Sequence, residues 1–590
     1  MSGTMGRMYI GASGLQASQN AINTTAHNLT NLDTEGYSRQ QVIQSDLGYQ
    51  KLGFTKVSIK QTGLGTKVSQ TRTTRDIFLD NKYRTQNARK EFYNTKAGII
   101  DEVGEFFGET EGNTFETYLK NMWNSIQELQ KTPNGYTQRT ALVSTASAFI
   151  DRATEIHDQL VDYQKNLNET IQDQVDRINE LSQTIMNIND KILKLESSGV
   201  EAANDYRDAR NQALDELSGL ISIEIKEQSN GTVNVYAEQH SLVSEDRTFV
   251  IGTVPVEPGS DLLTVFWEND TVVRPDGTVD YSTAKVFNLE RPMVAGDNLD
   301  TGSLKGLLSA RGDYTPNYTD IPFRRDHMDL TDSEYQQLLT DYNRTLNNRD
   351  VANLISQFDN LIHGIVTKMN DILCPNTEIT VTNGNTYTIL DTANAGRGFG
   401  AGNEAQGTEL FTRKGYDRYT YDGTIQYVDE NGDLQTGAWI FNPEDANDYY
   451  SLYTTGQVEV NDALLQNPAL LPLTTTDDEE YQEVANQLID MWNEDFSTLD
   501  PNSLVMNTYN NYYAALVGDY ADRGHTYTNI GLTQETLVGE VDNQRQEVLG
   551  VSSDDELTNL IKYQHAYNAN SRYITVVSEM IEHLIERLGS

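Results

Sequence analysis

The chain has 590 residues, of which 44 are basic and 87 acidic, giving a formal net charge of −43. Binding to nucleic acid or to an anionic membrane depends on clusters of Lys and Arg, so this charge argues strongly against both partners. One cysteine, Cys374, excludes an intramolecular disulfide and a thiolate metal cluster. Because no stretch approaches about 18 apolar residues, we expect no membrane insertion. The first residues also lack the basic and apolar regions of a cleaved secretory signal.

Residues 1–31 are expected to form a helix that can accept a closely packed partner. Large and small residues alternate along it, each kind recurring every seven positions. The large ones are Met8, Leu15, Ile22 and Leu29, and the small ones are Gly11, Ser18 and Thr25. Small side chains would let a second helix approach. Beyond a turn-rich segment, apolar residues and glycines in 40–72 predict a short β-hairpin.

The middle of the chain alternates between helical and strand patterns. Residues 75–220 predict helices, including an antiparallel helical hairpin over 156–220. Alternating residues from 223 predict strands joined by a turn at Ser229-Asn230-Gly231. Residues 351–373 return to helical spacing. From 376 to about 480 the pattern predicts strands and loops, with turns at Asp422-Gly423 and Asn431-Gly432, and helix resumes near 503.

The last helix carries a narrow apolar seam that is typical of a coiled coil. Its apolar residues fall alternately three and four positions apart, with Asn570 as an interruption. The seam residues are Leu560, Tyr563, Tyr567, Ile574, Val577, Ile581, Leu584 and Leu588. A helix with so narrow a seam is marginal in water by itself. We therefore expect the two terminal helices to pair, and their twelve large seam residues to form an assembly interface.

The expected fold class is α+β, as an elongated, discontinuous, multidomain chain. Paired N- and C-terminal helices would form a coiled coil, attached to a helical-bundle stem with β-rich inserted outer domains. The predicted domains are 1–45 with 551–590 for assembly, 46–222 with 300–375 and 500–550 for the stem, a β-rich insertion over 223–299, and a β- and loop-rich outer insertion over 376–499.

Catalytic chemistry finds little support in the sequence. The eight histidines are scattered and none is followed by Glu, so a zinc-protease motif is absent. The alternating glycines of 396–402 lack the lysine and hydroxyl of a phosphate-binding loop, and favour a flexible loop. Arg311-Gly312-Asp313 spells an adhesion tripeptide, which we interpret as coincidence. We expect no enzyme, and no catalytic, metal or cofactor-binding residues.

Both ends of the chain resemble the bacterial flagellar axial proteins, the family of rod, hook and hook-associated subunits. Gly14-Leu15 with His27 through Arg39 is similar to the N-terminal signature of that family, and Glu556 through Arg572 to its C-terminal signature. Four segments are similar to hook-associated members in particular. They are Tyr37-Ser38-Arg39-Gln40, the helix from Arg75 through Phe106-Phe107-Gly108 to Trp123, the helical stretch of 205–217, and Gly302 through Leu308.

The resemblance implies a structural subunit that polymerises at the hook–filament junction through its terminal helices. Its implied partners are further copies of itself, the hook protein, a second junction protein on the filament side, and an export chaperone that binds the C-terminal helix. It would be extracellular, exported by the flagellar secretion system without a cleaved signal peptide. Two alternatives stay open: another axial protein, such as a hook or rod subunit, or a flagellum-borne adhesin or hydrolase with its activity in 376–499.

The energetics of the seam predict when the terminal arms fold. Burying the eight large side chains of the C-terminal seam stabilises by about 10–20 kcal/mol at most, at ~1.5–3 kcal/mol each. Ordering about thirty residues costs more, at ~1–2 kcal/mol per residue. We therefore expect the arms to be disordered in the free protein and to fold on assembly.

Overall fold

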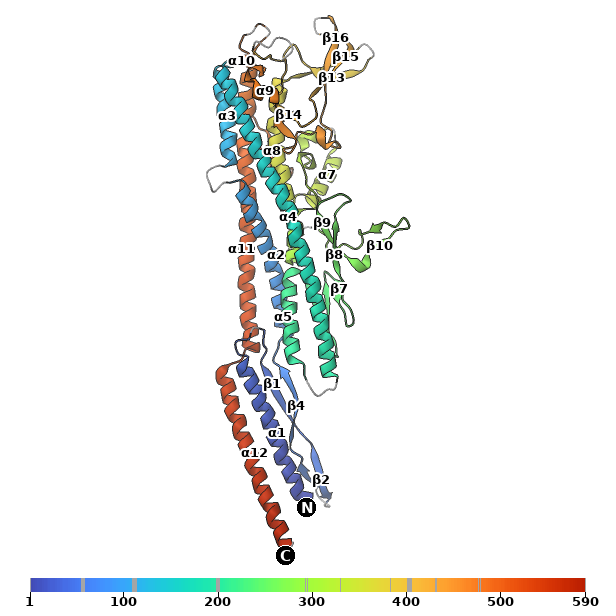
Figure 1. Ribbon diagram of the computed structural model, residues 1–590, viewed down its shortest axis with the longest axis vertical. Coiled ribbons are helices and arrows are strands. Elements are labelled where there is room, and N and C mark those ends of the chain that lie inside the picture. Colours follow the sequence, from blue (N-terminus) through green and yellow to red (C-terminus); the bar gives the residue numbers. More distant parts are fainter. Residues whose placement is uncertain are drawn as a thin grey trace.

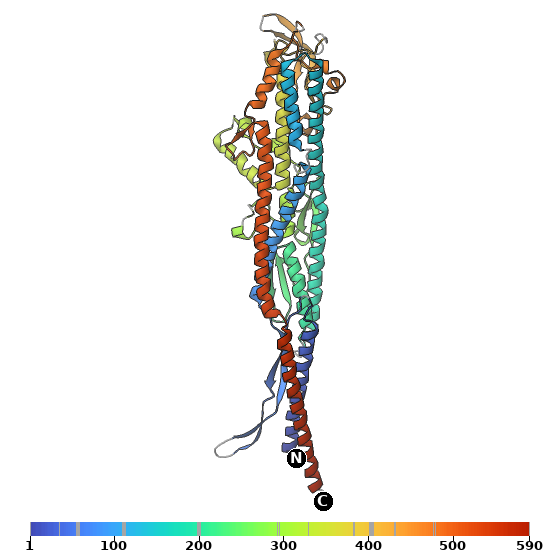
Figure 2. The ribbon, with the colours of Figure 1, turned by 90° about the vertical axis from the view of Figure 1, so that its left-hand side faces the viewer.

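The molecule is elongated, with terminal helices at one end and outer strands at the other (Figure 1). It stays narrow when turned by 90° (Figure 2). This computed structural model describes residues 2–34, 36–54, 59–108, 114–197, 202–291, 293, 295–328, 330–381, 384–399, 406–429, 432–475, 477 and 479–588. The predicted class, an elongated multidomain α+β chain, is confirmed.

The terminal end is built from two helices and one β-hairpin. Helices α1 (Ser2–Thr30) and α12 (Ser553–Leu588) lie side by side. The hairpin is longer than expected, because β1 (Gln40–Asp46) pairs with β4 (Thr66–Thr73), and β2 (Tyr49–Phe54) with β3 (Ile59–Gly63). Gly48 and Gly65 lie where the β1–β4 strand pair gives way to the β2–β3 pair, and their φ angles are 95° and 106°. Only glycine adopts such angles without strain, so both strands can bend at this level.

Seven helices form the stem. They are α2 (Ile77–Phe106), α3 (Phe115–Lys131), α4 (Tyr136–Glu196), α5 (Asn204–Leu220), α6 (Ser303–Arg311), α8 (Asp350–Leu373) and α11 (Tyr509–Leu549). Helices α4 and α5 make the helical hairpin expected over 156–220. With 61 residues, α4 is about 90 Å long, at ~1.5 Å per residue. Helix α8 is buried along most of its length and forms the centre of the core.

The chain between the end of α5 and the start of α6 forms small sheets that flank the stem. Strands β5 (Ile223–Glu227), β6 (Val233–Ala237) and β7 (His240–Val243) form a three-stranded antiparallel sheet, and Gly231 takes a φ of 84° in the expected turn. Two further antiparallel pairs follow. They are β8 (Ile251–Pro255) with β9 (Leu263–Trp267), and β10 (Val272–Val273) with β11 (Val279–Asp280).

The outer end carries a four-stranded antiparallel sheet in the order β12-β13-β16-β15. Its strands are β12 (Asn376–Thr380), β13 (Thr386–Leu390), β15 (Tyr419–Val428) and β16 (Leu434–Phe441). The turn predicted at Asp422-Gly423 is wrong, because these residues lie inside β15. The register shifts there, and the Asp422 carboxylate accepts a hydrogen bond of 2.8 Å from Thr424 N. Asp and Gly therefore mark a bulge within the strand.

Several shorter elements lie along the side of the stem and near the outer end. They are α7 (Asp332–Thr345), β14 (Phe411–Arg413), β17 (Val458–Val460), α9 (Asp462–Gln466), α10 (Gln482–Asn493), β18 (Ser497–Thr498) and β19 (Met506–Asn507). Helix α10 was not predicted; it packs on α3, where Trp492 stacks on Trp123 with ring centroids 5.6 Å apart. The division of the chain into four domains stays a prediction.

Two segments noted in the sequence have structural roles. Arg397 and Thr474 exchange backbone hydrogen bonds of 2.8 and 3.0 Å, so the described part of the glycine-rich stretch pairs with another segment and is not a free loop. Gly400, Gly402 and Asn431 lie outside the described residues. In the tripeptide, the Arg311 side chain is fully buried and donates to Leu263 O at 2.6 Å, where a partner protein has no access to it.

Candidate assembly interface

The two terminal helices run antiparallel, so both chain ends lie at the same end of the molecule (Figure 1). Their pairing is fixed by contacts of Gly11 with Ile574 near that end and of Asn28 with Glu556 at the other. These contacts join residues more than 500 positions apart in the chain, as for Asn28 and Glu556, which are 528 residues apart.

Small residues form the buried stripe of α1. Ala17, Ser18, Ala21 and Thr25 are all at most 5 % exposed. A Cβ atom added to Gly11 would lie 2.7 Å from Ile574 Cγ1, which is closer than van der Waals contact allows. At Gly14 it would lie 2.7 Å from Asn570 Oδ1, so the residue that interrupts the seam fills the space left by a glycine. Close approach of α12 therefore depends on the absence of side chains here.

The predicted large seam residues are only partly brought together. On α1, Met8 is exposed and Leu15, Ile22 and Leu29 are half-buried beside the small-residue stripe. On α12, Val577 is buried and Leu584 is exposed. The others with a described side chain are half-buried: Leu560, Tyr563, Tyr567, Ile574 and Ile581. The side chain of Leu588 lies outside the described ones.

Helix α12 also exposes apolar side chains outside the predicted seam. Leu557, Ile561, Val576, Met580 and Ile585 are between 45 % and 63 % exposed. Sequence reasoning missed them because it searched for a single narrow seam. The signal was the four-residue spacing of 557 with 561 and of 576 with 580. Helix α12 therefore has more apolar surface than α1 covers.

A buried carboxylate joins the terminal helices where they meet the stem. Glu556, 2 % exposed, accepts from Asn28 Nδ2 at 3.1 Å and pairs with Arg39 Nη2 at 2.7 Å. Tyr37 donates its hydroxyl to Asn28 Oδ1 at 2.8 Å. Desolvation and the nearby carboxylates raise the pKa of Tyr37, which keeps its hydroxyl a donor. Arg39 N donates to Leu549 O at the end of α11, tying the pair to the stem.

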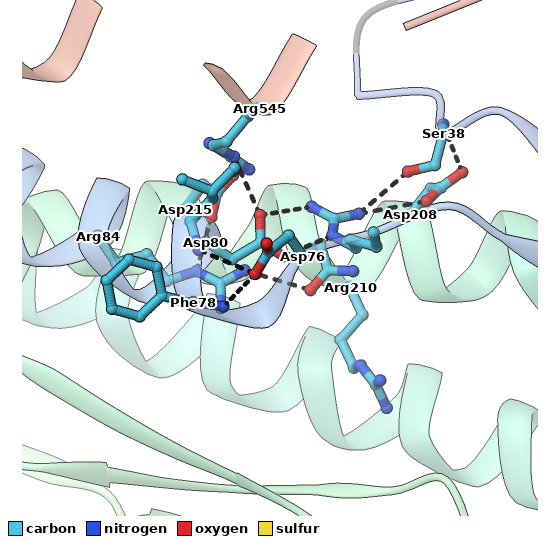
Figure 3. Close-up of polar contacts among 12 residues, drawn as sticks. Ser38, Asp76, Phe78, Asp80, Arg84, Asp208, Arg210, Asp215 and Arg545 are labelled. Carbon is cyan, nitrogen blue, oxygen red and sulfur yellow. Dashed lines mark hydrogen bonds and ion pairs between the residues drawn. The ribbon is translucent and has the colours of Figure 1, made fainter. Parts of the chain in front are cut away.

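The segment between α1 and β1 is held on the stem by Asp208 of α5 (Figure 3). The Asp208 carboxylate accepts from Ser38 N at 2.9 Å and from Arg75 Nη1 at 3.3 Å. Burial raises its pKa, although the bonds to Ser38 and the charge of Arg75 oppose that effect. Arg75 also pairs with Asp80 at 2.7 Å. Ser38 is thereby linked to α5 directly and to α2 through Arg75, whose Nη1 donates to Ser38 Oγ at 3.2 Å.

The same network continues into α11. Arg545 donates to Asp80 Oδ1 at 3.0 Å and to Asp215 Oδ2 at 2.6 Å, and Arg84 pairs with Asp215 at 2.7 Å (Figure 3). Sequence reasoning quoted Ser38, Asp208 and Asp215 within motifs, but gave none of them a contact. The alternating charges bind α2, α5 and α11 at the level where the terminal helices attach.

Two further kinds of site can be judged in the part of the chain that the structure describes: a metal site and a membrane-spanning helix. In those residues no three His, Cys, Asp or Glu side chains are grouped so that they could hold a metal ion. No described helix combines the length and the apolar character needed to span a bilayer.

Comparisons with known proteins match the ends and the middle of the chain separately. Residues 100–385 match the family described as the flagellar hook-associated protein FlgK helical domain. Residues 8–37 match the flagella basal body rod protein family, and 543–587 the flagellar basal body rod FlgEFG protein C-terminal family.

Relatives match over nearly the whole length. Flagellar hook-associated protein 1 of Bacillus subtilis is 24 % identical over 584 residues, covering 98 % of this chain and 96 % of the relative. That of Escherichia coli is 24 % identical, with 97 % and 98 % covered. The flagellar hook junction protein FlgK of Burkholderia pseudomallei has a similar fold, with a TM-score of 0.50, 12 % identity, and coverage of 80 % of this chain and 100 % of that one.

Proposed function

Because this chain belongs to the flagellar hook-associated protein 1 family, we propose that its α1–α12 pair is the element through which it polymerises. The chain is a structural subunit of the bacterial flagellum at the hook–filament junction, and it assembles with other axial proteins. The proposal concerns which residues make that assembly.

One observation carries the proposal: α12 has large apolar side chains on more faces than α1 can cover. Val576, Met580 and Leu584 are each nearly half exposed, at 47–49 %. A row of such residues on a helix remote from the stem core is costly in water and marks an interaction site. Neighbouring subunits would cover it. Because it meets a different surface of each neighbour, such a contact builds rings or helical tubes.

The remaining partners are proposed from the position at the hook–filament junction that the family indicates. We propose that the hook protein lies on one side of the assembled ring and a second junction protein on the filament side. Before export, a chaperone would cover the apolar face of α12 by taking the helix into a groove. The chain would then act outside the cell, after export by the flagellar secretion system without cleavage.

The arms are proposed to become ordered only on assembly. The arms contact the stem through polar groups, among them Ser38 N with Asp208, Arg39 N with Leu549 O and Gln40 Nε2 with Asp205. The proposal of no enzymatic activity rests on the structural role of the family. Glycan hydrolysis by the full-length chain, lost on substitution within 376–499, would contradict it.

Met580→Asp tests the interface. A carboxylate on the uncovered face must be desolvated in the assembled ring, so we expect at least a ~10-fold loss of incorporation into flagella, since each ~1.4 kcal/mol is tenfold. The measurement is the amount of tagged chain in purified flagella. His565→Asp, at an exposed polar position of the same helix, is the control and should incorporate normally. Equal incorporation of both variants would contradict the proposal.

A further inference from the structure

The β-hairpin that follows α1 is basic, in contrast to the rest of the chain. Residues 47–75, the basic segment, hold β2, β3 and β4 and contain six basic residues and no acidic one. The whole chain has 44 basic and 87 acidic residues, so acidic residues dominate elsewhere. The six basic residues are Lys51, Lys56, Lys60, Lys67, Arg72 and Arg75. Charge that is segregated in this way marks a surface that attracts an oppositely charged partner.

Two of these cations are exposed on β4 without a counter-charge. In the part of the chain that the structure describes, neither Lys67 nor Arg72 forms an ion pair, with Asp46 of the partner strand or with any other residue. Arg75 differs from them, because it is bound to carboxylates of the stem. Lys67 and Arg72 are therefore available to a partner outside the molecule.

A complementary acidic surface lies where α11 ends and α12 begins. Residues 540–556 contain six acidic residues and one basic residue, Arg545, which is buried and bound to carboxylates of α2 and α5. Four of the acidic residues are exposed and form no ion pair among the described residues; these four, the acidic junction, are Glu540, Glu547, Asp554 and Asp555. The last turn of α11 has no basic residue, so the partial negative charge at its C-terminal end adds to these carboxylates.

A subunit cannot bring its own Lys67 to its own acidic junction. Arg39 N, just before β1, donates to Leu549 O at the end of α11, so the base of the hairpin lies beside the junction. Lys67 pairs with Ser45, six residues beyond Arg39 (39 to 45), which is ~20 Å at ~3.3 Å per residue of strand. The hairpin projects to one side of the molecule (Figure 2), and α1 separates it from α12 (Figure 1). The acidic junction that Lys67 can meet is therefore that of another copy.

We propose that the basic segment of one copy of this chain binds the acidic junction of the next copy in the assembled ring. The inference rests on the proposed polymerisation and adds an electrostatic contact to the apolar one of the terminal helices. In a ring, each copy presents one surface to one neighbour and a different surface to the other. The attraction also opposes the repulsion between two molecules that each have a net charge of −43.

Crosslinking between differently tagged copies tests the contact while leaving every charge in place. One copy carries Ser69→Cys, on the same strand face as Lys67, and the other carries Gln544→Cys, between Glu540 and Glu547 on one helix face. Both are full length and co-expressed in flagellated cells. The native Cys374 is fully buried and does not compete. With a short bismaleimide reagent, we expect a crosslinked species that carries both tags, and such a species can only join two molecules.

Competition measures the effect of the charge. Lys67→Glu is co-expressed with the wild-type chain, and the ratio of the two is measured in purified flagella. We expect the variant to be roughly threefold to tenfold under-represented, because a carboxylate would then face the carboxylates of the acidic junction. Arg247→Glu is the matched control, since it makes the same change of charge at a side chain that is 66 % exposed and remote from the hairpin. It should incorporate at parity.

Charge exchange tests the pairing of the two surfaces. Glu547→Lys alone should also lower incorporation, because the new cation repels the basic segment of the neighbour. A chain that carries both Lys67→Glu and Glu547→Lys should incorporate better than either single variant, because each contact between copies then joins opposite charges again. This recovery also shows that the single variants fail through the contact and not through misfolding.

The outcomes separate this contact from the polymerisation itself. If both cysteine variants enter flagella but no doubly tagged product forms, the electrostatic contact is wrong and the terminal interface stands. Binding of the wild-type chain to phosphatidylglycerol vesicles, with no such product, would assign the basic segment to an anionic membrane and overturn the inference. Equal incorporation of Lys67→Glu and Arg247→Glu would likewise overturn it. If the wild-type chain is absent from the hook–filament junction, the proposed function fails first.

Discussion

The stem and the terminal pair are both helical, but they hide very different amounts of apolar surface. In the stem, Phe358 of α8 is fully buried, with its ring centroid 5.6 Å from that of Phe107 and 5.1 Å from that of Phe115. In the described part of α12, Val577 is the single large apolar side chain that is buried. Helix formation is therefore no guide to which helices a lone chain can stabilise.

Because of this difference, the stem and the terminal pair are expected to be stabilised by different contacts. The stem completes its core from its own helices, whereas the terminal pair buries mainly glycine, alanine, serine and threonine. Small residues contribute close approach but little hydrophobic free energy. Three experiments test this division, beginning with the one that should give the largest effect.

Phe358→Ala should lower the free energy of unfolding of the full chain by about 3–5 kcal/mol, because it leaves a cavity in a closed core. Leu15→Ala, in the half-buried terminal pair, should lower it by less than ~1 kcal/mol. Denaturant unfolding of the free protein, followed with amide exchange, measures both. Equal destabilisation would mean that the arms and the stem unfold as one unit, and the proposal of arms ordered on assembly would be wrong.

Gly11→Ala should weaken the terminal pair because the new methyl group meets Ile574 Cγ1 at 2.7 Å. Overpacking of this kind costs about 1–3 kcal/mol. Gly6→Ala is the matched control, since a Cβ there has no neighbour within 4 Å. Both changes gain the same helix propensity, ~1 kcal/mol, so their difference isolates the contact. The readout is incorporation into flagella; a result in which the two variants behave alike would refute close packing at Gly11.

The smallest effect concerns pH at the attachment of the pair. Burial raises the pKa of Asp208 above its ordinary value of about 3.9, so the folded state holds the proton more tightly than the unfolded state does. The Asp208 carboxyl therefore stabilises the folded state fully at pH values below its unfolded-state pKa. This stabilisation is lost as the pH rises through the higher pKa that the group has in the folded state. Asp208→Asn should flatten this dependence.

Limited proteolysis within residues 31–39, compared across that pH range, provides the measurement. The segment should become easier to cleave as pH rises in the wild-type chain and should not change in Asp208→Asn. Stem fragments released at the same rate in both proteins serve as the internal control. A wild-type segment that becomes more resistant as pH rises would reverse the sign and exclude Asp208 as the group responsible.

Regular spacing explains what the sequence could predict. The helical spacing over 156–220 predicted the hairpin of α4 and α5, and the terminal signatures identified the family. Helix α10 was missed although Val484, Leu488 and Trp492 recur four apart, because it is short and lies among turns. Asp422-Gly423 predicts a hairpin turn, but glycine is also common where a strand bulges, as β15 does here.

Contacts between distant segments explain what it could not. Arg39 and Glu556 were both quoted within signatures, yet no local pattern says that they pair 517 residues apart. The solvent exposure of Leu504–Met506 could not be predicted either, because a short apolar run has the same sequence pattern whether it is buried or exposed. Such facts emerge only when the helices are placed together.

The antiparallel arrangement of α1 and α12 has a consequence for how the molecule is delivered. Under the proposed export through the flagellar secretion system, one end of the chain emerges first, and the leading arm then waits for the whole intervening sequence. Until the trailing arm arrives, Gly11 has no Ile574 and Asn28 has no Glu556. The close packing of α1 on α12 can therefore form only after both ends of the chain have been delivered.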